Sequence, residues 1–130
     1  VVISEGELYE GSTWEALLFA SHHKPKNLTI FIDINNLIIL GETKDCVDLE
    51  PIKDKLEGFG FDIFDVDGHD VGQIKDALDK KSDTTKVILA RTIKGKGFSL
   101  MENKPHWHYM NQMSEEEITQ CRKEINNVSA

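Results

Sequence analysis

The sequence predicts an α/β fold in which a parallel sheet carries helices on both faces. Short apolar runs rich in β-branched residues recur along the chain, and segments with the apolar spacing of helices separate them. The runs are almost continuously apolar, which is typical of parallel strands covered on both sides. The four expected strands span residues 1–3, 28–34, 61–66 and 87–93.

The first and last helices are predicted from capping-box patterns, in which a Ser precedes a Glu by three positions. Ser12 and Glu15 open the first helix, which should end before Pro25. Ser114 and Glu117 open the last, over residues 114–126. We expect this last helix to pack on the body of the protein and to have no chemistry of its own.

Two further helices fill the middle of the chain. One is expected over residues 49–57, with Ile52 and Leu56 facing inward and glycines as stop signals. The other should begin at Asp70, whose carboxylate can cap it. Its predicted inward face consists of Val71, Ile74, Ala77 and Leu78.

The predicted organisation is one α/β domain over residues 1–112, followed by a C-terminal helix over 113–130. At 130 residues, with 39% hydrophobic and 29% charged residues, the chain suits one ordinary soluble domain. Because Val1 already lies in an apolar strand pattern that reads as buried, we expect an upstream part of the domain to be missing. Its loss would leave residues 1–3 with an uncovered side.

The charge and cysteine content narrow the possible partners. A formal net charge of −8 with scattered lysines disfavours binding to nucleic acid. Cys46 and Cys121 match neither a zinc nor a disulfide spacing, which indicates reduced thiols. No apolar run approaches the roughly 18 residues that span a bilayer, so we expect no membrane partner and a cytoplasmic protein.

Polar residues follow the first two strands, where ligands of parallel sheets bind. Glu5 comes after the first strand, and Asn35 comes 30 positions later, after the second. A carboxylate, an amide oxygen and a backbone carbonyl such as that of Leu37 are the hard oxygen ligands that Mg²⁺ takes. Taken alone, this pair is equally compatible with ordinary turn residues.

Longer motifs surround these positions. Residues 4–16 read Ser-Glu-Gly-Glu-Leu-Tyr-Glu-Gly-Ser-Thr-Trp-Glu-Ala, and residues 33–35 read Asp-Ile-Asn. This pattern resembles the thiamine diphosphate signature of transketolases, as do residues 59–60, 66–70, 92–97 and 107–108. The resemblance extends from Val1 to about Tyr109.

The resemblance implies an enzyme that moves a two-carbon ketol unit between ketose and aldose phosphates, using thiamine diphosphate and Mg²⁺. It implies a metal site formed by Glu5, Asn35 and the carbonyl of Leu37. The implied cofactor-binding residues are Gly6, Glu7, Asn35, Ile39, Lys94 and His108. His108 and Glu10 are the implied catalytic residues, and Glu10 and Glu15 match a carboxylate network that links paired sites across a dimer.

Four of the implied roles have a plainer alternative, whereas Glu10 has none. Lys94 is otherwise a solvated loop lysine, and His108 packs against its neighbouring tryptophan. Ile39 is otherwise an ordinary buried residue after a strand, and Glu15 merely completes a capping box.

Two departures from the family pattern fall on the metal site. Gly-Asp-Gly is replaced by Ser4-Glu5-Gly6, so the expected ligand is longer by a methylene. If the backbone at Ser4 required a positive φ, the strain would be on the order of 1–3 kcal/mol. The alternative reading is therefore a degenerate, non-catalytic partner or regulatory domain with this fold. A pyruvate-dehydrogenase-type α subunit is a third reading.

The family also uses upstream histidines and a downstream glutamate that this sequence does not contain. We therefore expect the chain to be inactive alone and to work with the remaining transketolase segments or a C-terminal subunit, in a homo- or hetero-oligomer. Trp14 and Phe19 on the first helix are predicted to form an exposed apolar patch near Glu10, and such patches favour association.

Overall fold

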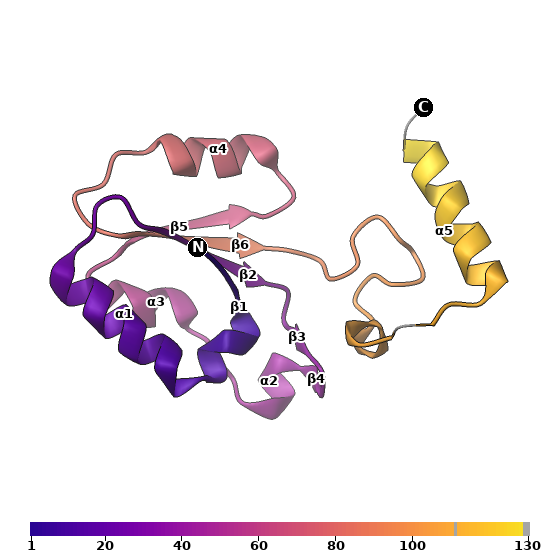
Figure 1. The fold of residues 1–130 in the computed structure, drawn as a ribbon, viewed down its shortest axis with the longest axis horizontal. Coiled ribbons are helices and arrows are strands. Elements are labelled where there is room, and N and C mark those ends of the chain that lie inside the picture. Colours follow the sequence, from indigo (N-terminus) through magenta and orange to yellow (C-terminus); the bar gives the residue numbers. More distant parts are fainter. Residues whose placement is uncertain (111, 129–130) are drawn as a thin grey trace.

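The computed structural model describes residues 1–110 and 112–128, so predictions for residues 111, 129 and 130 lie outside the described residues. A four-stranded parallel sheet in the order β1-β2-β6-β5 forms its centre (Figure 1). Its strands are β1 (Val2–Ser4), β2 (Thr29–Ile34), β5 (Asp62–Asp67) and β6 (Lys86–Arg91). The predicted fold class and the four predicted strands are confirmed.

The remaining elements connect or cover these strands. The helices are α1 (Gly11–His23), α2 (Thr43–Cys46), α3 (Ile52–Glu57), α4 (Val71–Asp79) and α5 (Glu115–Val128). Two 3₁₀ helices, η1 (Glu5–Tyr9) and η2 (Pro105–His108), and a small hairpin of β3 (Leu37–Ile38) and β4 (Gly41–Glu42) complete the described structure.

The main core lies between the sheet and the layer formed by α1 and α3 (Figure 1). Successive side chains of a strand point to opposite faces, so alternate residues of β2 and β6 enter this core. Ile32, Leu89 and Leu56 are all 0% exposed there. Ile52 and Leu56 face inward as predicted, although α3 begins at Ile52 and not at Leu49.

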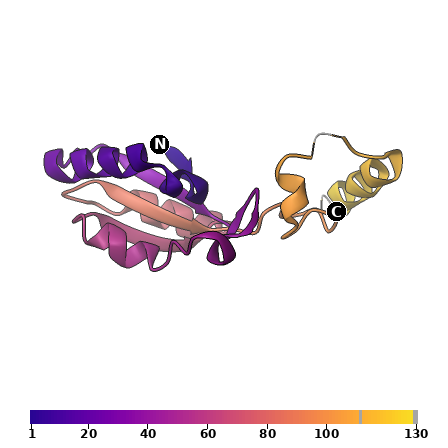
Figure 2. The ribbon, with the colours of Figure 1, turned by 90° about the horizontal axis from the view of Figure 1, so that it is seen from below.

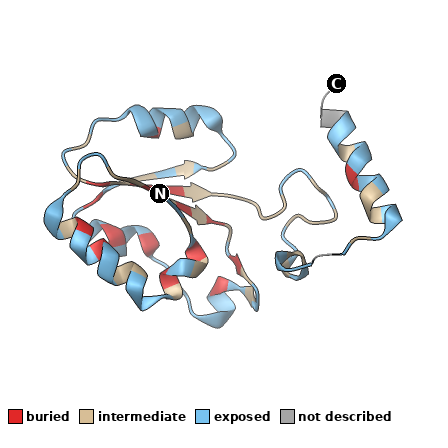
Figure 3. Ribbon diagram, viewed as in Figure 1, coloured by how far each residue is buried: buried red, intermediate tan, exposed pale blue. Residues whose placement is uncertain are grey.

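The opposite face of the sheet is covered less completely. There α4 packs on β5 and β6, and Phe31 of β2 is only half-buried. Val1 and Val2 are 73% and 74% exposed, so the expectation of a buried first strand is wrong, whereas its predicted uncovered side is observed. Figure 3 shows α4 itself as largely exposed, and only Ala77 of its predicted inward face is buried.

Helix α1 differs from its prediction in how it begins. Its N-cap is Glu10, so Ser12 lies inside the helix and the predicted capping box with Glu15 is wrong. Trp14 is not part of an exposed patch either, because its Nε1 donates to the carbonyl of Leu8 at 2.8 Å and its ring stacks on Phe59. Phe19, by contrast, is 67% exposed as predicted.

Helix α5 stands apart from the sheet, at the far end of a long connecting segment (Figures 1 and 2). The Ser114–Glu117 capping box is confirmed, since each residue's backbone N–H donates to the other's side chain. Packing on the body is not confirmed, because α5 lies clear of the sheet (Figures 1 and 2). Among its described side chains, Cys121 is the buried one. Glu124 instead accepts from the N–H and the hydroxyl of Ser99 in the connecting segment.

None of the helices in the described residues has the length and apolar character needed to cross a bilayer.

Candidate active site

The candidate site forms where β1 and β2 end side by side. Ser4 is in register with Asp33, so the loops that follow the two strands start as neighbours. Glu5 begins η1 directly after β1 and is only 2% exposed. Asn35 directly follows β2. Parallel strands thus bring together residues that lie far apart in sequence.

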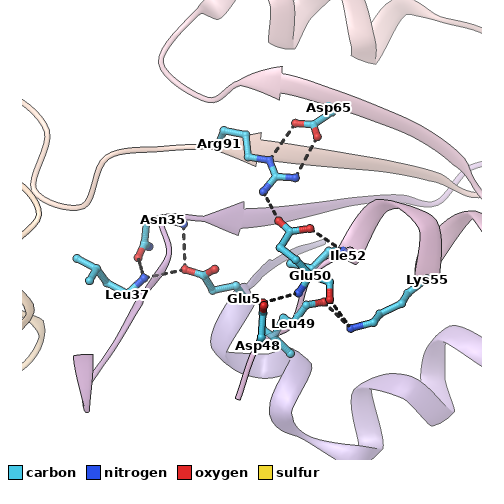
Figure 4. Close-up of polar contacts among 10 residues, drawn as sticks. All are labelled: Glu5, Asn35, Leu37, Asp48, Leu49, Glu50, Ile52, Lys55, Asp65 and Arg91. Carbon is cyan, nitrogen blue, oxygen red and sulfur yellow. Dashed lines mark hydrogen bonds and ion pairs between the residues drawn. The ribbon is translucent and has the colours of Figure 1, made fainter. Parts of the chain in front are cut away.

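The Glu5 carboxylate is bound to the second loop (Figure 4). Its Oε1 accepts the backbone N–H of Asn35 at 3.0 Å and that of Leu37 at 3.1 Å. Asn36, between these two donors, has a left-handed φ of 60°, which Asn tolerates better than most residues. This turn points both amides at Glu5, and the predicted closeness of Glu5 and Asn35 is confirmed.

The electrostatics of Glu5 follow from this burial. Desolvation raises the pKa of the Glu5 carboxyl, and hydrogen bonds from the amides of Asn35 and Leu37 oppose the rise. A buried carboxylate held by backbone donors is a preorganised acceptor.

The oxygen donors gathered here have the chemistry that Mg²⁺ prefers. They are the Glu5 carboxylate, the side-chain Oδ1 of Asn35 and the main-chain carbonyl of Leu37. Asn35 Oδ1 accepts the N–H of Leu37 at 3.1 Å, which fixes the amide beside the turn. Across residues 1–110 and 112–128, no group of three His, Cys, Asp or Glu side chains is arranged to hold a metal. A metal site at this position therefore depends on the amide and carbonyl oxygens.

Ser4 fits its position without strain. Its φ of −89° and ψ of 160° are extended, so the positive φ considered from the sequence is not required. The N–H of Ser4 donates to Oε2 of Glu7 at 2.8 Å. Glu7 thus folds back to satisfy the start of η1.

Lys94 and Asn35 line one open hollow of about 750 Å³ at the carboxyl ends of the strands. The hollow lies on the α4 side of the sheet, where Phe31 and Ala90 form part of its apolar wall. Lys94 is half-buried in this wall. The structure therefore brings a cation within the same concavity as the candidate metal ligand Asn35.

The other predicted site residues lie on separate elements. Gly6 is in η1 beside Glu5. Ile39, in the β3–β4 turn, is 54% exposed, so its alternative reading as a buried residue is wrong. His108 is exposed in η2, which contacts β3, and Glu10 is exposed at the start of α1.

Two side chains to which the sequence analysis gave no role connect the loops. The hydroxyl of Thr92 donates to Asp33 Oδ1 at 2.5 Å, and Asn35 Nδ2 donates to Asp33 Oδ2 at 3.5 Å. Asp33 thus joins the segment after β6 to the candidate metal ligand. Asp33 lies in the motif at 33–35 and Thr92 in the motif at 92–97. Their membership of these motifs was the sequence signal that could have identified them.

Known proteins resemble this chain along most of its length. Residues 1–127 match the family described as "Transketolase, thiamine diphosphate binding domain". An apulose-4-phosphate transketolase subunit from Actinobacillus succinogenes is 40% identical over 111 residues, which cover 84% of this chain and 40% of that protein. Human transketolase is 36% identical over 107 residues, covering 82% of this chain and 17% of the human protein.

The crystal structure of transketolase from Campylobacter jejuni superimposes with a TM-score of 0.86 at 31% identity. The alignment covers 96% of this chain and 20% of that one. The chain thus spans well under half the length of these relatives. Because the family match covers almost the whole sequence, the chain belongs to the transketolase family, within its thiamine diphosphate-binding domain.

Proposed function

We propose that this chain is the cofactor-binding part of a transketolase that transfers a two-carbon ketol unit between ketose and aldose phosphates. The observation that supports the proposal most is the turn at Asn35–Leu37. Its amides are held by the buried Glu5 carboxylate, and Asn35 shares a hollow with Lys94. The oxygen donors of this turn suit a divalent cation, and the positive charge of Lys94 suits a diphosphate.

Glu5, Asn35 and the Leu37 carbonyl would hold Mg²⁺ in this proposal. When bound, thiamine diphosphate supplies the electron sink that ketol transfer requires. The chain's own contribution is to bind and orient, since its hydrogen-bonded loops fix the donor atoms before ligand arrives. Such preorganisation limits the ordering cost of binding.

Gly6 supports a close approach of the diphosphate. A Cβ on Gly6 would meet its nearest protein atoms, Ser4 Oγ at 3.5 Å and Ile38 Cγ2 at 4.0 Å, at ordinary distances. Packing within this chain therefore does not demand a glycine there. A ligand that must approach the backbone would demand it.

The remaining residues have proposed roles from the family pattern. Lys94 would attract the diphosphate, and Glu7 would hold the loop that carries Gly6. Ile39 would contact the cofactor rings, and its exposure fits a surface that a ligand covers. His108 would contact the sugar, and Glu10 would join the second active site across a dimer.

We propose further that the complete enzyme includes polypeptide beyond this chain and works in the cytoplasm. The relatives from Actinobacillus succinogenes and from a Clostridium species are themselves transketolase subunits by name, and this chain covers 40% of the first. A homo- or hetero-oligomer with the remaining segments would complete the site. Sugar phosphates are the proposed substrates.

Titration calorimetry of thiamine diphosphate with Mg²⁺ tests the proposal, with this chain alone and with the complete enzyme. We expect weak or undetectable binding to the chain alone and clear binding to the complete enzyme. Asn35→Ala should weaken that binding at least about tenfold, because a ligand oxygen is lost. Glu5→Asp should tighten Mg²⁺-dependent binding by restoring the shorter ligand, and Glu57→Gln at the exposed end of α3 is the matched control.

One observation favours the alternative of a non-catalytic partner. Glu5 already accepts two backbone N–H groups, so it can hold its loop without a metal. Unchanged cofactor affinity in Asn35→Ala, together with no ketol transfer by the complete enzyme, would favour that alternative.

A further inference from the structure

The corner after β5 packs unusually closely on the segment after β6. The N–H of Gly68 donates to the carbonyl of Arg91 at 2.8 Å. A Cβ on Gly68 would lie 2.5 Å from Cγ2 of Thr92, a distance that packed side chains do not reach. Only glycine allows so close an approach to Thr92, and the hydrogen bond to Arg91 holds the corner in this place.

The next residue of the corner, His69, binds the same segment. Its ring nitrogen Nε2 accepts the backbone N–H of Ile93 at 2.8 Å. The backbone N–H of His69 donates in turn to Oδ1 of Asp67 at 2.8 Å, which fixes the turn that carries the ring. For Nε2 to accept, the imidazole must be neutral, with its proton on Nδ1.

The hydrogen bond from Ile93 to His69 matters because of where Ile93 lies in the chain. β6 ends at Arg91, so Ile93 lies beyond the strand ladder and directly before Lys94. On the other side, the Thr92 N–H donates to the Ile34 carbonyl at 2.8 Å. The backbone that presents Lys94 is thus held from β2 and from His69.

His69, Lys94 and Asn35 line the same hollow. Thr92 also reaches Asp33, which accepts from Asn35. One connected set of hydrogen bonds therefore joins the His69 corner, the Lys94 segment and the loop of the candidate metal ligand.

We propose that His69 is a positioning residue that holds Lys94 in the orientation needed for the diphosphate. This inference rests on the proposed function. His69 acts through the Ile93 backbone, so its loss should lower cofactor affinity without removing a charge from the hollow. A hydrogen bond of this kind corresponds to about a three- to tenfold change in affinity.

The test uses the complete enzyme with thiamine diphosphate and Mg²⁺ as the probe. His69→Leu should raise the dissociation constant about three- to tenfold. His69→Gln, whose amide oxygen can reach the position of Nε2, should restore most of the affinity. The side chain of His69→Asn is too short to reach Ile93, so this variant should behave like His69→Leu. The comparison of His69→Gln with His69→Asn therefore tests the inference even if the Leu variant does not fold.

A double-mutant cycle separates positioning from general destabilisation. In a Lys94→Met background, His69→Asn should have no further effect, because the group that it positions is gone. Equal affinities of His69→Gln and His69→Asn, or full additivity with Lys94→Met, would overturn the inference. If Asn35→Ala also leaves the affinity unchanged, the proposed function fails as well. If only Asn35→Ala weakens binding, the role of His69 alone is wrong.

Discussion

The two faces of the sheet differ in how completely this chain covers them. On one face α1 and α3 enclose a core in which Ile32 and Leu89 are fully buried. On the other, α4 covers β5 and β6, while Val2 of the edge strand β1 is 74% exposed. Buried apolar area drives folding, so the first face should supply most of the stability. The hollow lined by Asn35 and Lys94 opens on this second, less covered face.

The largest expected effect comes from matched truncations on one strand. Ile32→Ala removes buried methyl groups from the enclosed face and should lower the free energy of unfolding by about 3 kcal/mol. Phe31→Ala removes a larger side chain from the open face, yet should cost only about 1 kcal/mol because Phe31 stays half-exposed. Urea denaturation of both variants measures the difference. Equal losses would show that the open face contributes to the core as much as the enclosed one.

A second prediction concerns association through the outer side of α1. Leu18 and Phe19 are 59% and 67% exposed, so the isolated chain should self-associate as its concentration rises. Phe19→Ser should raise the dissociation constant about tenfold, since aromatic anchors dominate interfaces. Leu40→Ser, at an 80% exposed position in the β3–β4 turn, is the control.

Sedimentation velocity at several concentrations provides the measurement. A monomer at every concentration would show that this surface is no interface. In the complete enzyme, Glu10→Gln should lower activity if the dimer network exists, and unchanged activity would leave Glu10 as a plain N-cap residue.

The four strands of the parallel sheet and the starts of α4 and α5 could be predicted because their signals are local. Apolar β-branched runs identified the four strands of the parallel sheet but not β3 and β4. Asp70 caps α4 by accepting hydrogen bonds from Gly72 and Gln73. The start of α1 was missed because η1 precedes it and shifts the helix boundary to Gly11. The Ser–Glu pair that does interact is Ser4–Glu7, one element earlier.

The sequence predicted that Glu5 and Asn35 lie close together, but not the hydrogen bonds that connect their loops. The spacing of Glu5 and Asn35 placed both at strand ends that proved adjacent. The sequence carries no signal that one carboxylate oxygen would accept two amides of the facing turn, because this depends on the left-handed Asn36. The contacts of His69 with Ile93 and of Thr92 with Asp33 depend on the strand order in the sheet, in which β6 lies between β2 and β5.

A smaller effect is expected at a cluster of charges on the enclosed side. Arg91 of β6 binds Asp65 of β5 through two nitrogens and Glu50, before α3, through a third (Figure 4). Arg91→Gln should lower the free energy of unfolding by about 1 kcal/mol at pH 7, a modest value because all three side chains are partly exposed. Lys53→Gln, which affects an exposed pair within α3, is the control.

The pH dependence gives that prediction a sign. Burial raises the pKa of Glu50, but the hydrogen bond and charge of Arg91, together with the hydrogen bond from the Ile52 N–H, outweigh this and the folded-state pKa is lowered. A lowered pKa stabilises the fold above the unfolded-state pKa, and this contribution is lost as the pH falls through the folded-state pKa. The difference between wild type and Arg91→Gln should therefore shrink below about pH 4. A constant difference would mean that Arg91 stabilises by packing.

The smallest expected effect is on the open face, at the cap of α4. Hydrogen bonds from Gln73, its backbone N–H first, and from the Gly72 N–H hold the pKa of Asp70 below its usual value. Asp70→Ala should speed hydrogen exchange of the first-turn amides of α4, whereas Asp70→Asn keeps an acceptor and should change them less. Because α4 is largely exposed, the unfolding midpoint should move less than in Arg91→Gln. Because the folded-state pKa of Asp70 is lowered, its cap is lost as the pH falls through that pKa. The unfolding midpoint of wild type should then approach that of Asp70→Asn. If Asp70→Ala instead unfolds the whole protein, α4 is essential to the core, and the two faces are more nearly equal than their burial indicates.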